Sequence, residues 1–510
     1  MSETLTATVP RSSAASQLIR GAVSAFALNV LGYGCLFIGQ LLIARLLSRA
    51  EYAIFTVSIS FVGILAIVAD LGMNSLFTRL FAEAEEDVSV GRDDRRGLLL
   101  GSALVLRILL SLIVAGLLFL IAPMLYASTE VKTMSILLLT LVISSRILIV
   151  RSVGEAVLRG RGKYYIAAWF TLFDAMAFAA LMVFATYRHV HLEEVVWIYT
   201  LSNVPGFLLL TRSIVMWARR EHICIRAAWA TMHSLLQASL PLALGTAFLT
   251  IHTQIDNLLL DKLSTPLEVS SYGATMRLSA AMAPFSLVLA AVTSPELTKL
   301  LRRADHFRAQ QMTSISLRLL LVIGVAIALT VTALSSQIVP LMLGTKYASA
   351  SPLLIWTGWM LIPIFIGTLL MDLSIAAGYT WFMTANAGIC MVAVIVGDLI
   401  LIPANGATGA MASKLIAVTL GAGTMIWLSR NTGHLDSRRF ASAFAKAGIA
   451  ACSALGAFWA LRAFSIGEIL SAITMLAVYF FVIHFTHVLP MKEVISLVKR
   501  IRRPSDNTSA

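Results

Sequence analysis

Long apolar segments recur along the whole chain and constrain its fold more than any other feature of the sequence. A membrane-spanning helix needs about 20 mostly apolar residues. Fourteen segments meet this requirement, at residues 22–44, 53–73, 98–122, 133–150, 164–186, 194–216, 238–262, 270–295, 316–342, 352–376, 380–403, 406–429, 441–462 and 466–488. Only 13% of the residues are charged, against about 25% in a typical soluble domain. The sequence therefore predicts an all-α polytopic membrane protein of about 14 transmembrane helices, and it excludes a soluble enzyme, a fibrous protein and a disordered one.

The loops between these segments alternate between rich and poor in Lys and Arg. Since cytoplasmic loops carry the excess of Lys and Arg, we place both termini in the cytoplasm, which puts about 28 of these residues inside and about 7 outside. The net charge of +13 is then a positive-inside signature, and we expect no nucleic-acid partner. The polar N-terminus lacks the pattern of a cleaved signal peptide, so we expect the first apolar segment to stay as a membrane helix.

A weak internal repeat organises the chain into two halves. The segments EYAIFTVSIS at 51–60 and SSYGATMRLS at 270–279 open the second and eighth spans, with Tyr52 matching Tyr272. Two parallel six-span repeats place a substrate site between the halves, near the middle of the membrane. We therefore divide the chain into an N-terminal tail (1–20), an N-lobe (21–217), a linker (218–237), a C-lobe (238–430), a final pair of spans (440–489) and a basic tail (490–510).

Several ionisable side chains fall inside the predicted spans. A charge at the centre of a bilayer costs about 2.5–3.5 kcal/mol on insertion scales, so each one is a candidate for function. They are Arg107, Arg146, Arg277, Lys414, Asp70, Asp174, Asp256, Asp372 and Asp398.

Four of these ionisable side chains are predicted to share one depth. At about 1.5 Å per residue, Asp256, Arg277, Asp398 and Lys414 lie roughly 8–12 Å below the outer boundary. A neutral packing network and a substrate or ion-coupling site both fit this layer. Asp174 is a candidate partner for Arg107 in the first half.

Several kinds of catalytic or cofactor site have no signal in the sequence. The four cysteines are far apart and form no CxxC pair, which predicts neither a disulfide framework nor a metal site. No GxxxxGK[ST] motif is present, so energy must come from an ion gradient, the membrane potential or the substrate gradient. The outside loops are too short for an external catalytic domain. The acidic run at 83–87 is typical of a solvated surface. We therefore expect no enzyme and no cofactor.

Several segments resemble Wzx-type polysaccharide exporters of the multidrug/oligosaccharidyl-lipid/polysaccharide exporter superfamily, in the same order over about residues 17–430. These are LLIARLLSRAEYAIFTVSISFVGILAIVADLGM at 41–73, SLPLALGTAFLTIHTQIDNLLLDKL at 239–263, SYGATMRL at 271–278, GTKYASASPLLIW at 344–356 and LILIPANGATGAMASKLIAV at 399–418. The resemblance implies two six-helix lobes around a central cavity, here with two further C-terminal helices. It implies that undecaprenyl-pyrophosphate-linked oligosaccharides cross the bacterial inner membrane by alternating access, with a polysaccharide polymerase and co-polymerase as candidate partners.

The resemblance also suggests roles for individual residues. TMRL, followed by Pro284 and Pro295, resembles the eighth span of the fourteen-span lipid II flippases of this superfamily, which implies that Arg277 faces pyrophosphate. An arginine presents two parallel donors to phosphate oxygens, and Arg107 and Arg45 are further candidates. The first-span cations of those relatives are absent here, which favours a surface or exopolysaccharide repeat unit over lipid II.

A sodium site in the same relatives corresponds to Asp256, Asp398 and Lys414. It uses an acid in each of spans seven and eleven and a threonine in span twelve. Lys414 stands in the position of the threonine. We hypothesise that the Lys414 ammonium takes the place of sodium as a tethered cation, so that flipping needs no sodium.

Three alternatives remain open. A multidrug antiporter of the same superfamily usually has twelve spans and a carboxylate in the first one, and this chain departs from both features. A membrane glycosyltransferase or polymerase would need a large external loop. A scaffolding subunit of a polysaccharide complex is compatible with the sequence.

Overall fold

The fold is described from a computed structural model, over residues 11–89, 94–144, 149–188, 190–280, 282, 293, 297–301, 303, 305–432 and 435–489. These residues form helices and contain no β-strand, which confirms the predicted all-α fold. Arg146, Pro284, Pro295 and the basic tail at 490–510 lie outside the described residues.

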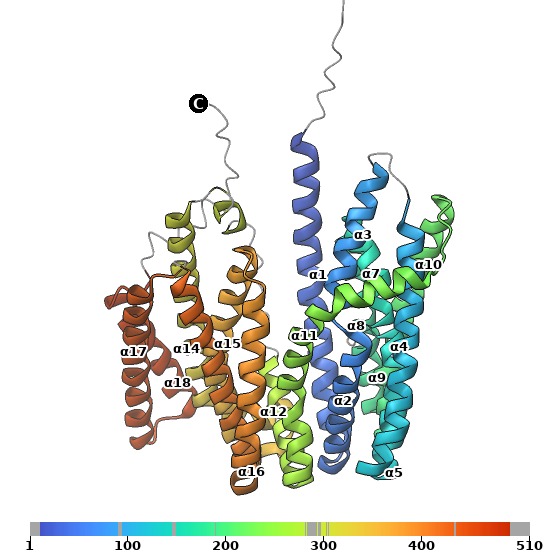
Figure 1. The fold of residues 1–510 in the computed structure, drawn as a ribbon. Coiled ribbons are helices and arrows are strands. Elements are labelled where there is room, and N and C mark those ends of the chain that lie inside the picture. Colours follow the sequence, from blue (N-terminus) through green and yellow to red (C-terminus); the bar gives the residue numbers. More distant parts are fainter. Residues whose placement is uncertain are drawn as a thin grey trace, which may run out of the picture. The chain divides into compact units, whose positions relative to one another are not determined.

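The described helices follow one another along the chain (Figure 1). They are α1 (Arg11–Leu46), α2 (Arg49–Asp70), α3 (Met73–Ser89), α4 (Arg96–Leu125), α5 (Ser128–Leu137), α6 (Thr140–Ile143), α7 (Val150–Gly160), α8 (Tyr164–Thr186), α9 (Leu192–Leu201), α10 (Val204–Arg220), α11 (Trp229–Leu263), α12 (Pro266–Ala280), α14 (His306–Leu343), the 3-10 helix η1 (Thr345–Ala350), α15 (Ser351–Ala376), α16 (Trp381–Asn431), α17 (Ser437–Ala463) and α18 (Glu468–Phe485).

Eleven helical stretches within the described residues are long and apolar enough to cross a membrane. One of them, α16, contains two predicted spans, because the backbone at Gly406 leaves the helical conformation with φ 52°. Glycine adopts such a positive φ without a steric penalty, and Pro403 precedes the break. The chain is therefore a multi-pass membrane protein, and the predicted boundary between 403 and 406 is confirmed.

Two predicted spans are not continuous helices. The prediction of one helix over 133–150 is wrong, because the segment is divided among α5, α6 and α7. The predicted span 194–216 is divided between α9 and α10, which meet at Asn203. A helix end leaves backbone carbonyls without helical partners. Arg151 Nη1 donates to one such carbonyl, Ile143 O, at 3.4 Å, and also to Asn203 O at 3.5 Å, which accepts the Phe207 amide as well.

The chain divides into two compact units. Unit 1 comprises Met1–Leu47 with Ser58–Ala247, and unit 2 comprises Ser48–Val57 with Phe248–Ala510. Within unit 1, α1 packs along α8, α3 packs on α7, and α8 also contacts α10 (Figure 1).

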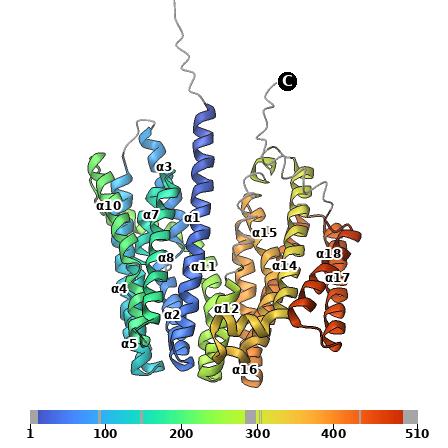
Figure 2. The ribbon, with the colours of Figure 1, turned by 180° about the vertical axis from the view of Figure 1, so that it is seen from behind.

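Unit 2 is built on α14, α15 and α16, which pack side by side. The helix α12 packs on α15 and α16, and the pair α17–α18 packs on α14 (Figure 2). Tyr479 on α18 donates its hydroxyl to Val322 O on α14 at 3.0 Å, so a buried hydrogen bond as well as apolar contacts joins the final pair to the rest of unit 2.

Candidate functional site

Arg277 lies among aromatic rings on α12. Its guanidinium carbon is 5.8 Å from the ring centre of Tyr52 and 5.4 Å from that of Phe55, both on the first part of α2. A guanidinium within about 6 Å of an aromatic face is held by the ring quadrupole. The side chain is half-buried, so this contact orients Arg277 without enclosing it completely.

Three of the four residues of the predicted charge layer, Asp256, Asp398 and Lys414, lie close to one another. Lys414 Nζ contacts Asp256 Oδ2 at 2.7 Å and also donates to His252 O on α11. The hydroxyl of Tyr272 donates to the same Asp256 oxygen at 2.5 Å. The salt bridge and the hydrogen bonds around Asp256 and Lys414 do not include Arg277, which instead stacks on the rings of α2.

Asp398 completes a cluster of one cation and two carboxylates. It is fully buried on α16, close enough to Asp256 and Lys414 to interact electrostatically with both. Neither of its carboxylate oxygens has a hydrogen-bond partner among the residues that the structure describes. We call Asp256, Asp398 and Lys414 the buried charge cluster. If both carboxylates are ionised, its formal charge is one negative unit, so a single proton or cation would neutralise it.

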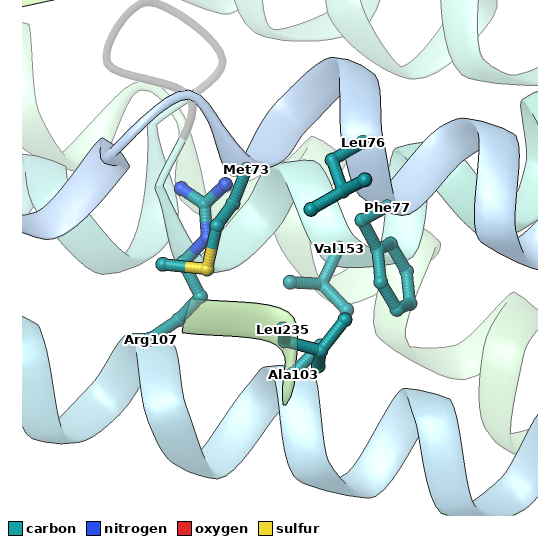
Figure 3. Close-up of a pocket in the computed structure, with 7 residues that line it drawn as sticks. All are labelled: Met73, Leu76, Phe77, Ala103, Arg107, Val153 and Leu235. Carbon is teal, nitrogen blue, oxygen red and sulfur yellow. The ribbon is translucent and has the colours of Figure 1, made fainter. Parts of the chain in front are cut away.

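Arg107 is held inside unit 1 by polar side chains. Its guanidinium donates to Asp70 Oδ1 and to Asn74 Oδ1, each at 3.2 Å. The side chain is buried and borders a cavity of about 10 Å³ (Figure 3), together with Met73, Leu76, Phe77, Ala103, Val153 and Leu235. That volume holds about one water molecule at most. In this conformation Arg107 is already paired and has no room for a phosphate group.

Asp174 pairs with Arg151, so the predicted pair of Asp174 and Arg107 is wrong. Arg151 Nη1 forms an ion pair with Asp174 Oδ2, and the Gly206 amide donates to Asp174 Oδ1 at 2.8 Å. Arg151 also binds Glu155 at 3.1 Å. Arg151 directly follows the predicted span 133–150 and is not among the candidate residues predicted from the sequence. The interruption of that span places it in the interior.

Arg45 lies in the last turn of α1, and its side chain is exposed. The nearby Arg49 is more constrained, because its Nη2 donates to Leu267 O at 2.8 Å and to Ser271 Oγ at 2.5 Å. Its guanidinium also lies 5.6 Å from the ring centre of Tyr347. Arg49 is not among the candidate residues predicted from the sequence, because its partners on α12 are more than 200 residues away along the chain.

A second charge network joins the ends of four helices in unit 1. Glu85 binds Arg96 at 3.2 Å and Arg161 at 3.1 Å, and both arginines bind Glu221 at 2.6 Å. The acidic run therefore contributes an inter-helix bridge through Glu85, beyond the solvated surface that was expected. Hydrogen bonds from Arg96 to Asp94, at 2.9 and 3.0 Å, hold the pKa of the Asp94 carboxyl below its ordinary value.

Comparison with known proteins decides the family. The family described as polysaccharide biosynthesis protein matches residues 18–301, more than half of the chain. The chain belongs to this family. No curated protein matches the sequence.

Solved structures share the fold of this family member. The structure of lipid II flippase MurJ in an inward closed conformation is similar with a TM-score of 0.69 and 15% identity, covering 94% of this chain and 100% of that chain. An inward-facing multidrug resistance MATE family transporter of the MOP superfamily gives a TM-score of 0.63 and 14% identity, covering 81% of this chain and 98% of that one. An outward-facing MATE transporter gives 0.58 and 15%, covering 82% and 95%. The predicted resemblance to Wzx-type exporters is confirmed, and the chain shares its fold with these solved transporter structures.

Proposed function

We propose that this protein is a flippase that moves undecaprenyl-pyrophosphate-linked oligosaccharide repeat units from the inner to the outer leaflet of the bacterial inner membrane, for surface or exopolysaccharide synthesis. The observation that carries the proposal is the family match over residues 18–301 on a fold that covers the whole of a lipid II flippase. Transport by alternating access requires no covalent chemistry, so we propose no catalytic residue.

Arg277 is the proposed pyrophosphate ligand. It is half-buried, and the aromatic rings of Tyr52 and Phe55 orient its guanidinium. A pre-oriented guanidinium loses less side-chain entropy when it binds a planar pair of phosphate oxygens. Arg107 and Arg45 stay secondary candidates: Arg107 would have to release Asp70 and Asn74 first, and Arg45 is exposed at the end of α1.

The buried charge cluster is the proposed coupling element. Lys414 already supplies one positive charge to Asp256, so a sodium ion is not required there. Asp398 leaves one carboxylate in excess, and uptake of a proton would neutralise the cluster. We therefore propose coupling to a proton gradient or to the membrane potential, with Lys414 as the tethered cation. In unit 1, Asp174 is satisfied by Arg151 and Gly206, which supports a structural role for it.

A multidrug antiporter is the alternative within the same superfamily, because MATE transporters share the fold. The MATE structures leave about a fifth of this chain uncovered, whereas the flippase structure leaves 6%. The first membrane helix, Ala27–Leu46, also has no carboxylate to attract a cationic drug. Both observations favour the flippase.

The experiment that tests the function is a deletion strain in which undecaprenyl-linked lipids and surface polysaccharide are measured together. We expect lipid-linked oligosaccharide to accumulate on the cytoplasmic leaflet and the polymer to be lost, and a plasmid copy of the protein to restore it. Normal polymer together with raised sensitivity to cationic drugs would show that the protein is a drug exporter instead.

A further inference from the structure

A basic cavity lies in unit 2 where α14, α17 and the end of α18 meet. Its volume is about 350 Å³, and its polar lining consists of Arg318, Arg438, Arg439, Ser442, Lys446 and His487. The cavity lies outside the buried charge cluster and the aromatic contacts of Arg277, and the proposed transport mechanism does not use it.

The cations of this cavity outnumber the acids. Arg439 is paired with Asp436 at 3.1 Å, and Arg318 and Lys446 form no ion pair within the described part of the chain. Lys446 Nζ donates to Thr486 O at 3.0 Å, and Arg318 Nη2 donates to Ser314 Oγ at 3.1 Å. These neutral partners hold the side chains in place and leave their charges uncompensated.

Arg318 also has a buried donor available. Its Nε has no hydrogen-bond partner among the residues that the structure describes, although it is shielded from solvent. A buried N–H without an acceptor costs about 1–3 kcal/mol. An anionic oxygen in the cavity would remove that cost and would also balance the excess positive charge.

The position of the cavity relates it to the edge of the membrane. Arg438 and Arg439 are in the first turn of α17, and His487 lies two residues beyond the end of α18. The helix α14 has 38 residues, or about 57 Å, so it extends beyond a hydrocarbon core of about 30 Å. The excess of Lys and Arg assigns this end to the cytoplasmic side. Phospholipid headgroups lie at this depth.

Exposed apolar rings lie at the same ends of these two helices. Phe444 is in the second turn of α17 and is 53% exposed, and Phe481 and Phe485, in the last turns of α18, are 62% and 66% exposed. A free phosphate ion would gain nothing from these rings, whereas the acyl chains of a lipid would cover them. A basic cavity with exposed rings at the same helix ends therefore fits a lipid better than a soluble anion.

We propose that this cavity binds the headgroup of an anionic phospholipid, with phosphate oxygens on Arg318 and Lys446 and acyl chains along α17 and α18. Basic pockets between membrane helices on the cytoplasmic side are suited to such headgroups. The bound lipid would join α14 to the final helix pair. The proposal does not depend on which substrate the protein carries.

The test uses the full-length protein in phosphatidylcholine nanodiscs with and without cardiolipin, and native mass spectrometry to count retained lipids. We expect cardiolipin to be retained and to raise the apparent Tm. The double variant R318Q/K446Q should bind it about 25-fold more weakly, at about fivefold for each cation lost. The conservative variant R318K/K446R should retain binding, which separates the role of charge from a failure to fold.

A matched control removes two exposed cations near the start of α14, in the variant R303Q/R308Q. We expect it to bind cardiolipin like the wild type. Equal losses of cardiolipin binding in R318Q/K446Q and R303Q/R308Q would show only general attraction to the membrane and would overturn the proposal. Retention of phosphatidylcholine to the same extent as cardiolipin would overturn it as well. Selective binding of undecaprenyl pyrophosphate, with no effect of cardiolipin, would assign the cavity to the substrate instead and would also overturn it.

Discussion

A lysine inside a membrane protein needs acceptors for its ammonium group, and Lys414 finds them on a different helix. Its Nζ contacts Asp256 Oδ2 and His252 O, and Tyr272 supports the same carboxylate. Arg277, by contrast, is oriented by the rings of Tyr52 and Phe55. The two cations were predicted at one depth, but their surroundings differ. Lys414 has an acid as its partner, whereas Arg277 lies against two aromatic rings.

Arg277→Ala is expected to abolish export, because it removes the proposed pyrophosphate ligand. Arg277→Lys should retain part of it, about tenfold below wild type, since one charge-assisted hydrogen bond worth roughly 1.5 kcal/mol is lost. Export is measured as surface polysaccharide in the deletion strain carrying each variant. Tyr52→Phe keeps the ring under the guanidinium and serves as the control with normal export. Full activity of Arg277→Ala would remove Arg277 from the mechanism.

Lys414→Met is expected to stop export and to destabilise the protein by about 3–5 kcal/mol, because it leaves a buried carboxylate without its cation. The double variant K414M/D256N removes both charges and should recover most of the stability without recovering export. Wild-type transport should be unchanged when sodium is replaced by potassium or choline. Transport and stability are both measured on protein reconstituted in liposomes. Export by a Lys414 variant together with a sodium requirement would refute the tethered-cation hypothesis.

At the scale of elements, interrupted helices are the main feature of unit 1. The breaks near Ser144 and at Asn203 bring the start of α7 and the start of α10 to Asp174. A carboxylate near helix N-termini is favourable, because the unpaired amides and the helix dipole attract negative charge. The interior charges therefore stabilise the positions of helix ends. In unit 2, Glu268 has a comparable role, since it accepts a hydrogen bond from the Ala407 amide just after the break in α16.

Gly206→Ala tests the contact between α10 and α8. A Cβ at Gly206 would lie 2.6 Å from Asp174 Cγ, so the carboxylate would have to move away from Arg151. We expect a destabilisation of about 1–3 kcal/mol, typical of overpacking. It is measured as a lower apparent Tm in detergent.

Gly116→Ala in α4 is the matched control for Gly206→Ala, because a Cβ there meets no atom within 4 Å. We expect it to be neutral or to stabilise the protein by up to about 1 kcal/mol, since alanine has the higher helix propensity. Equal Tm values for the two variants would contradict the tight packing of α10 against Asp174.

At the scale of the whole molecule, the positive-inside pattern predicts the orientation of every loop. The cations that it places inside also make the inter-helix network of Glu85, Arg96 and Arg161, and the basic cavity of unit 2. The residues that are predicted to orient the chain therefore include some that bridge its helix ends. Orientation can be tested independently of transport.

Cys224 provides that test, because it is exposed between α10 and α11 in a segment assigned to the cytoplasm. In a variant that keeps Cys224 as its single cysteine, a membrane-impermeant maleimide should label inverted membrane vesicles but not intact cells. Lys132→Cys in a background without other cysteines should show the opposite pattern, since Lys132 is assigned outside. Labelling of Cys224 in intact cells would reverse the predicted topology.

The sequence by itself determined the class of protein, the family resemblance and most of the membrane helices, because each depends on local apolar length and loop charge. It also placed the break near Gly406, since Pro403 and glycine act on the backbone locally. The tertiary structure alone decided which charges meet. Arg151, and not Arg107, is the ion-pair partner of Asp174, and Arg277 contacts the aromatic rings of α2. The physical reason is that depth along a helix follows from residue number, whereas the direction and neighbours of a side chain depend on how helices rotate and break against one another.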